Sequence, residues 1–163
     1  MILDKKIYTL LNDQITKEYY SAYLYLQIAA YYDEHGLDGY ASWYEKQAHE
    51  EEEHAMKIYR YLHENGQEVK LGQIDAPNVT FNDFLEPVKA ALAHEEYITG
   101  CINDLMTAAK GVHDYRTMEF LQWFVHEQGE EEVNANRMVK LMETFGGKKL
   151  GLFVLNEKVK ERQ

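Results

Sequence analysis

Apolar side chains recur every three or four positions through four long stretches of the chain, with polar and charged residues between them. This period is typical of an amphipathic α-helix. Glycines follow the stretches, and only two prolines occur in the whole sequence, so few positions interrupt the pattern. The chain is therefore predicted to be all-α, with long helices at about 4–35, 38–65, 82–110 and 114–145 and a short amphipathic helix at about 149–160.

The connections between these helices constrain the topology. Few residues join the first helix to the second, or the third to the fourth, so each pair should be antiparallel. The connection at 67–81 has fifteen residues. It could extend roughly 50 Å, whereas the second helix spans roughly 40 Å. A crossover along the bundle is thus permitted, which would make the second and third helices parallel. We expect Asp38 to cap the second helix, and Thr80 or Asn82 to cap the third. Pro87 falls slightly late for a first turn.

One carboxylate interrupts the apolar stripe of each long helix. The stripe of the first helix contains Glu18, that of the second Glu51, and that of the third Glu95. The stripe of the fourth helix carries Gln128 and Glu131. Each of the four glutamates sits close to the midpoint of its helix, and the midpoints of antiparallel helices share one level. The four carboxylates are therefore expected to meet in a single layer of the core.

Such a layer needs a neutralising partner, because an unpaired buried charge costs several kcal/mol. No lysine or arginine occupies these stripes, which leaves protons or metal ions. Two divalent cations would balance the four negative charges. His54 lies three residues after Glu51, on the same helix face, and oxygen ligands with one imidazole suit iron, manganese or zinc. A raised pKa, or a side chain that reaches solvent, is the alternative for any single glutamate.

Composition narrows the class of partner. A net charge of −11 argues against nucleic acid and against an anionic membrane surface. Cys101 is the only cysteine, so no internal disulfide can form. The first residues are too charged for a signal peptide, and the longest apolar run, at 152–155, is far too short to span a membrane. We expect a soluble, cytoplasmic protein with one domain over 1–163.

The pattern of ligand candidates resembles a known family. A Glu-x-x-His motif at Glu51 and His54, with partner glutamates at Glu18, Glu95 and Glu131, resembles that of the ferritin-like di-iron proteins. The resemblance covers the whole chain. It implies a ferritin-like four-helix bundle with a long crossover between the second and third helices and a short fifth helix at the C-terminus.

Three details resemble bacterial non-haem ferritins in particular. Di-iron oxidases and bacterioferritins have a second Glu-x-x-His on the fourth helix, whereas Asn134 follows Glu131 at that spacing and Gln128 precedes it. Glu52 aligns near the methionine that holds haem in bacterioferritins, so no haem is predicted. A single cysteine cannot form the Cys-x-x-Cys domain of rubrerythrins.

The resemblance assigns residues to two iron sites. Glu18, Glu51 and His54 correspond to the first site. Glu51 would bridge to the second site, which Glu95 and Glu131 complete. Both sites would lie within one subunit and hold the two irons of a di-iron centre.

Further residues surround these sites in the family. Gln128 would lie near the second iron. Glu50, Glu127 and Glu130, joined by Glu131, match the spacing of a third iron site; an ordinary solvated helix surface is the alternative for these three.

Aromatic and histidine side chains near the centre are harder to assign. Tyr25 lies two turns from Glu18 on the same stripe and could hydrogen-bond a ligand or donate an electron, although core packing is a rival role. Trp123 resembles a tryptophan beside the family's centre and is expected to pack there. His94, beside Glu95, is expected to point off the stripe.

The activity that the resemblance implies is a ferroxidase coupled to iron storage. Fe(II) would be oxidised with O2 or H2O2 and kept as a ferric oxyhydroxide mineral inside a hollow homo-oligomer of twenty-four subunits, with the helix at 149–160 packed around the fourfold axis. Two alternatives stay open: a di-iron oxidase or peroxidase that stores no iron, and a bundle in which the metals only stabilise the fold.

Overall fold

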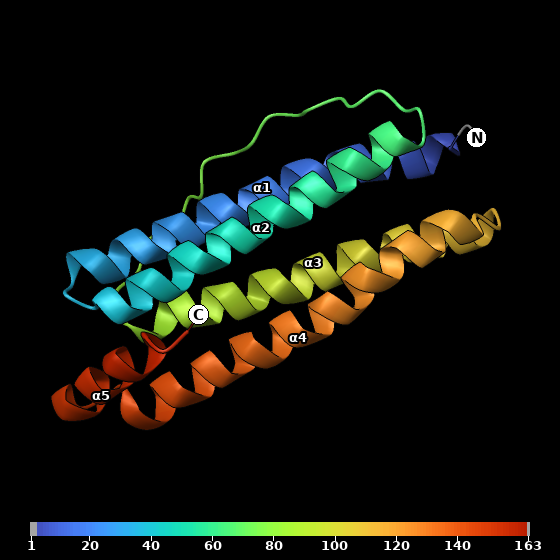
Figure 1. The fold of residues 1–163 in the computed structure, drawn as a ribbon. Coiled ribbons are helices and arrows are strands. Elements are labelled where there is room, and N and C mark those ends of the chain that lie inside the picture. The colour runs from blue at the N-terminus through green and yellow to red at the C-terminus, as the bar shows by residue number, and fades with distance from the viewer. Residues whose placement is uncertain (1–2, 163) are drawn as a thin grey trace.

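The helical pattern is realised as five α-helices. The computed structural model describes residues 3–162, and within that range no strand occurs. The prediction of an all-α chain is confirmed (Figure 1), and the helix boundaries in the structure lie within three residues of those expected. The helices are α1 (Lys5–Glu34), α2 (Asp38–Glu64), α3 (Leu85–Gly111), α4 (Tyr115–Phe145) and α5 (Lys149–Val159).

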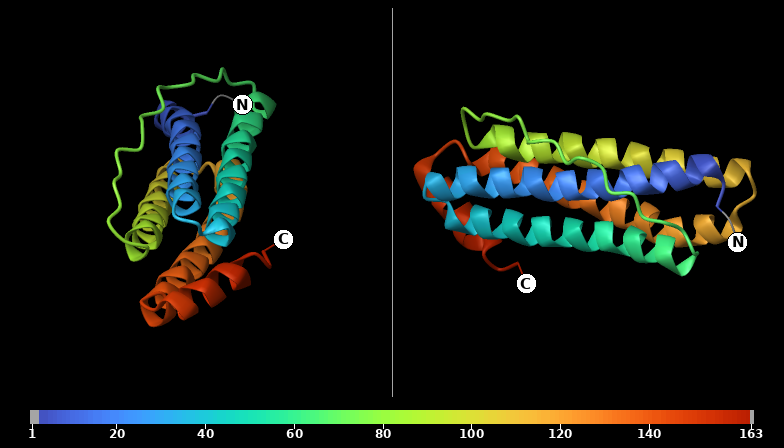
Figure 2. Two further views of the ribbon diagram at one scale, coloured as in Figure 1. Left: turned by 90° about the vertical axis from the view of Figure 1, so that its left-hand side faces the viewer. Right: turned by 90° about the horizontal axis from the view of Figure 1, so that it is seen from above.

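Two antiparallel hairpins form the bundle. Helix α1 pairs with α2, α3 pairs with α4, and α1 also lies against α3. The connection between α2 and α3 runs along the outside of the bundle from one end to the other, so α2 and α3 are parallel (Figures 1 and 2). Two backbone N–H groups of this crossover donate to α1: Lys70 N to Asn12 Oδ1 at 2.7 Å, and Gly72 N to Thr16 Oγ1 at 3.3 Å.

The ends of the helices follow the glycines only in part. Gly36 and Gly66, just after α1 and α2, have φ values of +80° and +69°, a region that glycine enters without steric cost. At the end of α3 the glycine does not follow the helix, because Gly111 is itself the last helical residue. His113 instead takes the positive φ of 57° that turns the chain into α4.

Two predicted caps are wrong. Asp38 is the first residue of α2 and not its cap, which is Leu37. At the start of α3, Asp83 does what Thr80 or Asn82 was expected to do: its Oδ1 accepts from the N–H groups of the next two helical residues, at 3.0 and 2.8 Å. Helix α3 therefore begins late enough for Pro87 to fall within its first turn, where a missing N–H removes no intrahelical bond.

Helix α5 supplies the cap that α2 lacks. The Oδ1 atom of Asn156 accepts from Gly39 N at 2.8 Å and from Tyr40 N at 3.2 Å. A Cβ on Gly39 would lie 1.9 Å from the carbonyl oxygen of Asn156, so the approach of α5 requires glycine there. The start of α2 is thus held by a residue more than a hundred positions away in the chain.

The core is divided into two apolar clusters, one toward each end of the bundle. Along α1 the first cluster ends at Ile15 and the second begins at Ala22; along α2 the division falls between Ala55 and Ala48. Glu18 and the other three predicted carboxylates occupy the interval between the clusters. The polar layer therefore interrupts an otherwise continuous core. No helix among residues 3–162 is long and apolar enough to cross a membrane.

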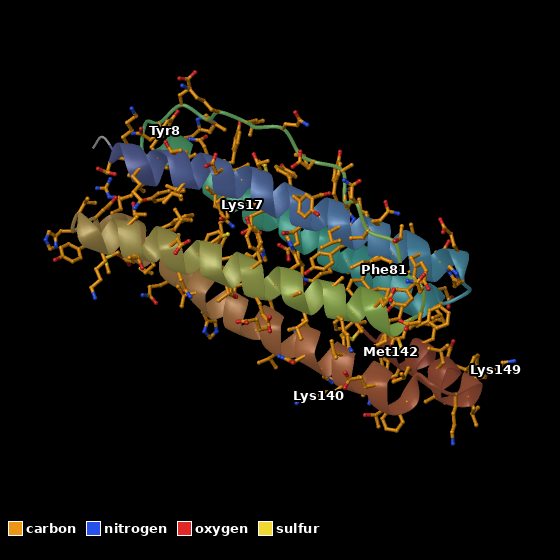
Figure 3. The ribbon with its side chains drawn as sticks, turned by 180° about the vertical axis from the view of Figure 1, so that it is seen from behind. Tyr8, Lys17, Phe81, Lys140, Met142 and Lys149 are labelled. Carbon is orange, nitrogen blue, oxygen red and sulfur yellow. The ribbon has the colours of Figure 1, made fainter. Side chains whose placement is uncertain are left out.

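The end of the bundle that carries α5 is incompletely covered. Met142 is buried there, whereas Lys140 and Lys149 are exposed (Figure 3). Large apolar side chains are exposed beside them, with Phe153 at 61% and Leu150 at 76%. A cavity of about 850 Å³ opens between α5 and the end of α4.

Candidate metal centre

All five predicted ligands of the two iron sites come together at mid-height of the bundle. Helix α1 contributes Glu18, α2 contributes Glu51 and His54, α3 contributes Glu95, and α4 contributes Glu131. Every one of these side chains is buried. They form two groups that share Glu51, and in each group one ligand atom per residue lies within 4.8 Å of the others.

The first group joins α1 to α2. His54 Nδ1 lies 3.1 Å from Glu51 Oε2 and 3.9 Å from Glu18 Oε2. Gln14 Nε2 donates to Glu18 Oε1 at 3.1 Å. The other oxygen, Glu18 Oε2, is buried and accepts no hydrogen bond from any described residue. An orphaned carboxylate oxygen in a core is costly, so this atom indicates a place for a cation.

The second group joins α2, α3 and α4. Gln128 Nε2 donates to Glu95 Oε2 at 3.0 Å. Gln47 Nε2 lies between two ligands and donates to Glu131 Oε2 at 2.6 Å and to Glu51 Oε1 at 3.2 Å. Each carboxylate of the layer is thus oriented by at least one amide, and an amide adds no positive charge.

Burial makes ionisation of these carboxyl groups unfavourable. It raises the pKa of Glu18 and Glu51 well above the usual range, and neighbouring carboxylates raise both further. Burial likewise raises the pKa of Glu95, although hydrogen bonds oppose the effect. The pKa of Glu131 rises to about 8, first through burial and then through the charge of Glu95. Within residues 3–162 no lysine or arginine forms an ion pair with any of the four, so protons or metal ions must neutralise them.

Tyr25 reaches into this layer. Its hydroxyl donates to Glu95 Oε1, and the tyrosine is itself buried. Burial and the nearby carboxylates raise the pKa of Tyr25 well above its usual value, so the phenol keeps its proton. Trp123 lies on the other side, with its ring centroid 5.3 Å from that of His54.

His94 points off the stripe, as expected, but it does not face solvent. It lies between α1 and α3, where Nε2 is 2.6 Å from Ser21 Oγ, and burial lowers its pKa to about 4. It belongs to none of the described groups of ligand atoms. A neutral imidazole bonded to a hydroxyl there holds the two helices together.

The residues expected at a third site are only partly assembled. Glu127 joins His54 and Glu131 in a third group of ligand atoms. Glu50 and Glu130 lie outside every such group found among the described residues. Glu50 is paired with Arg162, and Glu130 lies 3.4 Å from His126 Nε2 on the same helix.

Sequence reasoning missed two contributors to the centre, Gln14 and Gln47. Each stands four residues before a ligand, Glu18 and Glu51 respectively, and donates to it across one helical turn. The signal was present in the sequence, because residues four apart face each other on a helix.

The donor set fits divalent metal ions. The protein is thus a four-helix bundle with a carboxylate-rich layer. Its carboxylate oxygens, its one imidazole and its orphaned buried oxygen suit metal ions. Residues 8–145 match the family model described as Ferritin, a ferritin-like domain. The chain belongs to the ferritin family.

Individual relatives agree with this assignment. The chain is 41% identical to a bacterial non-heme ferritin of Staphylococcus epidermidis over 131 residues, which cover 80% of this chain and 79% of that protein. It is 32% identical to a bacterial non-heme ferritin of Staphylococcus aureus over 161 residues, or 99% and 97% of the two chains. The crystal structure of an open pore ferritin from Archaeoglobus fulgidus superposes with a TM-score of 0.97 at 37% identity, covering 99% and 100%. The function of the family is iron storage with ferroxidase activity.

Proposed function

We propose that this chain is an iron-storage ferroxidase that oxidises Fe(II) in pairs at a di-iron centre within each subunit. The orphaned oxygen of Glu18, in a layer of four buried carboxylates that meets no lysine or arginine in the described chain, is the observation that carries the proposal. Two divalent ions would supply the four positive charges that the layer lacks.

The two groups of ligand atoms support a place for each of the two ions. One ferrous ion would bind to Glu18, Glu51 and His54, and the other to Glu51, Glu95 and Glu131. Glu51 belongs to both groups and would bridge the two ions. Nearby glutamines each donate to a carboxylate oxygen and so orient it, while a second lone pair on that oxygen would stay available to iron.

A pair of ferrous ions delivers two electrons together. One O2 then takes up both electrons and two protons to give H2O2, or one H2O2 takes them up with two protons to give two waters. The raised pKa values of the carboxyl groups keep protons in the layer before iron binds, and binding releases them. Tyr25 would orient Glu95 through its hydrogen bond and stands close enough to supply a further electron. Glu50, Glu127 and Glu130 would form a third site beside the pair, on the path of the product.

Storage requires an enclosed volume, and we propose a hollow homo-oligomer of twenty-four subunits in the cytoplasm. The exposed apolar side chains of α5, among them Leu150 and Phe153, would pack against other subunits. The acidic excess would partly line the cavity in which ferric oxyhydroxide collects.

Aerobic titration with Fe(II), followed at near-ultraviolet wavelengths, tests the proposal. The wild-type assembly should oxidise iron rapidly and keep many irons per chain in solution. Glu51→Ala should abolish rapid oxidation, whereas the matched Glu53→Ala, on the same helix but with its side chain 74% exposed, should not.

Other outcomes identify the two alternatives. Oxidation that stops near two irons per chain would identify an oxidase without storage. Unchanged oxidation in Glu51→Ala, with a lower melting temperature, would make the metal layer purely structural. A sizing column that shows only monomer or dimer would contradict the shell.

A further inference from the structure

The residues after α5 fold back onto α2 and place a guanidinium beside the metal centre. Arg162 Nη2 lies 2.9 Å from a carboxylate oxygen of Glu50. Its Nη1 donates to the carbonyl oxygen of Trp43 at 3.1 Å, and the guanidinium lies over the Trp43 ring, 4.2 Å from the centroid. Lys46 Nζ donates to the carbonyl oxygen of Arg162. With its side chain only 13% exposed, Arg162 is docked and not free in solvent.

Glu50, the partner of this guanidinium, belongs electrostatically to the centre. It precedes the bridging ligand Glu51 on α2, and its charge contributes to the raised pKa of Glu131 on α4. Its side chain is nevertheless 48% exposed, so an ion from solution can reach it. Glu50 therefore links the buried layer to the surface.

Two cavities that share lining residues lie between the tail and that layer. A cavity of about 200 Å³ is lined by Arg162, Trp43, Asn134 and Met138. The last three also line a smaller cavity of about 20 Å³ that reaches Glu131 and other residues of the centre. Arg162 thus lines the larger cavity, next to the smaller one that reaches Glu95 and Glu131.

We propose that Arg162 is a tethered competitor for the third cation site: it occupies Glu50, and a divalent cation that binds there must displace it. The inference rests on the proposed function of the carboxylate centre. A guanidinium and a metal ion compete because both need the same carboxylate oxygens. After displacement, the contact of Lys46 with the Arg162 carbonyl keeps the arm nearby at high effective concentration, so Arg162 returns when the ion leaves.

The consequence is a third site that binds ions only briefly. The two inner sites can bind their ions while Arg162 stays docked. Within residues 3–162, no contact joins the guanidinium to any ligand of these two sites. An ion that moves outward to Glu50 competes with the guanidinium of Arg162 for the carboxylate, so it dissociates from Glu50 quickly. Arg162 would therefore set how long an ion stays beside the pair.

Calorimetric titration with Zn²⁺, which undergoes no redox change, tests this in the assembled metal-free protein. Arg162→Gln should bind the third zinc about fivefold more tightly than wild type, the effect of removing one partly exposed ion pair. The first two zinc ions should bind as in wild type. Glu50→Gln should lose the third zinc whether or not Arg162 is present. Arg137→Gln, a charge removed from the same cavity, is the matched control and should behave as wild type.

Tryptophan fluorescence gives a second readout that needs no calorimetric model. The chain has two tryptophans, so a Trp123→Phe background leaves Trp43 alone to report the tail. The third zinc should change Trp43 emission in that background, and adding Arg162→Gln should remove the change.

The outcomes separate the two proposals. If the two inner zinc ions fail to bind, the proposed function fails. If they bind, and Arg162→Gln leaves the third affinity unchanged, competition by the tail is refuted, even if the variant melts at a lower temperature.

Discussion

Replacing Glu131 with glutamine isolates the energetic penalty of the carboxylate layer. The amide keeps the shape of the side chain and an oxygen that can accept from Gln47, but it carries no charge. In the metal-free protein burial and the charge of Glu95 raise the pKa of Glu131 from its ordinary value of 4.5 to about 8. The folded state therefore retains a proton between these values that the unfolded state has lost.

The sign of the pH dependence follows from this proton. At a pH below the ordinary pKa of glutamate, Glu131 is protonated in both the folded and the unfolded state, so it does not lower the free energy of unfolding. As pH rises toward 8, unfolding releases a proton and becomes easier; above about 8 the penalty is complete. The shift sets an upper bound of ~5 kcal/mol on the loss of unfolding free energy. We expect ~1–3 kcal/mol in practice, because the neighbouring carboxyl groups titrate together and share protons.

The assay is thermal unfolding of chelator-treated protein at fixed concentration, at pH 5.5 and pH 8.5. Glu131→Gln should raise the melting temperature at pH 8.5 by roughly 2–4 °C per kcal/mol and should have little effect at pH 5.5. Zn²⁺ should stabilise wild type more than the variant. Glu130→Gln makes the same change on the exposed face of α4, and it should leave the pH dependence intact. A variant that melts below wild type at pH 8.5, with the same dependence on pH, would refute the reasoning.

Four further variants test separate parts of the molecule. His54→Ala removes the one imidazole ligand and should slow ferrous oxidation by roughly 100-fold; a stopped-flow rate near that of wild type would contradict the site. Tyr25→Phe should lower the melting temperature by a few degrees, because it leaves Glu95 Oε1 without its donor, and should slow repeated turnover ~3-fold or more; multi-turnover oxygen consumption measures the second effect. Gln47→Leu should weaken zinc binding ~10-fold in calorimetry, and equal affinity would show that the amide is dispensable. Phe153→Asp should split the assembly in sedimentation, and a wild-type sedimentation coefficient would exclude α5 from the interface.

The carboxylate layer could be predicted from the sequence because two local signals, the helical period and the position of each glutamate along its helix, together place the four side chains at one level of the bundle. The helical period places Glu18, Glu51, Glu95 and Glu131 on buried stripes. Each lies near the middle of its helix, and the middle stays at the same level whichever way the helix runs. Residues on either side of each glutamate fall into different apolar clusters, as that reasoning requires. The length of the crossover showed only that it could run along the whole bundle. The parallel arrangement of α2 and α3 was established by the structure.

Features that depend on distant segments lay beyond the sequence. The cap of α2 comes from Asn156 on α5, so no local pattern near Asp38 could reveal it. The pairing of Glu50 with Arg162 is equally non-local, and no pattern near Glu50 indicates it. At the start of α3, Asp83 competed with two equally plausible caps, and propensity does not distinguish between them.

The choice of donors around the layer would let the proposed centre hold ions in position and still release them. Gln14, Gln47 and Gln128 each donate to a ligand, which orients the carboxylates. Because amides are neutral, only protons compensate the carboxyl groups until cations displace them. A lysine in any of these positions would satisfy the same oxygen and neutralise it permanently. The guanidinium of Arg162 is paired with Glu50 at the rim, where it would compete with an outgoing ion without contacting the ligands of the two inner sites. Neutral donors inside and a displaceable cation outside are what a centre needs if its metal is substrate and must pass through.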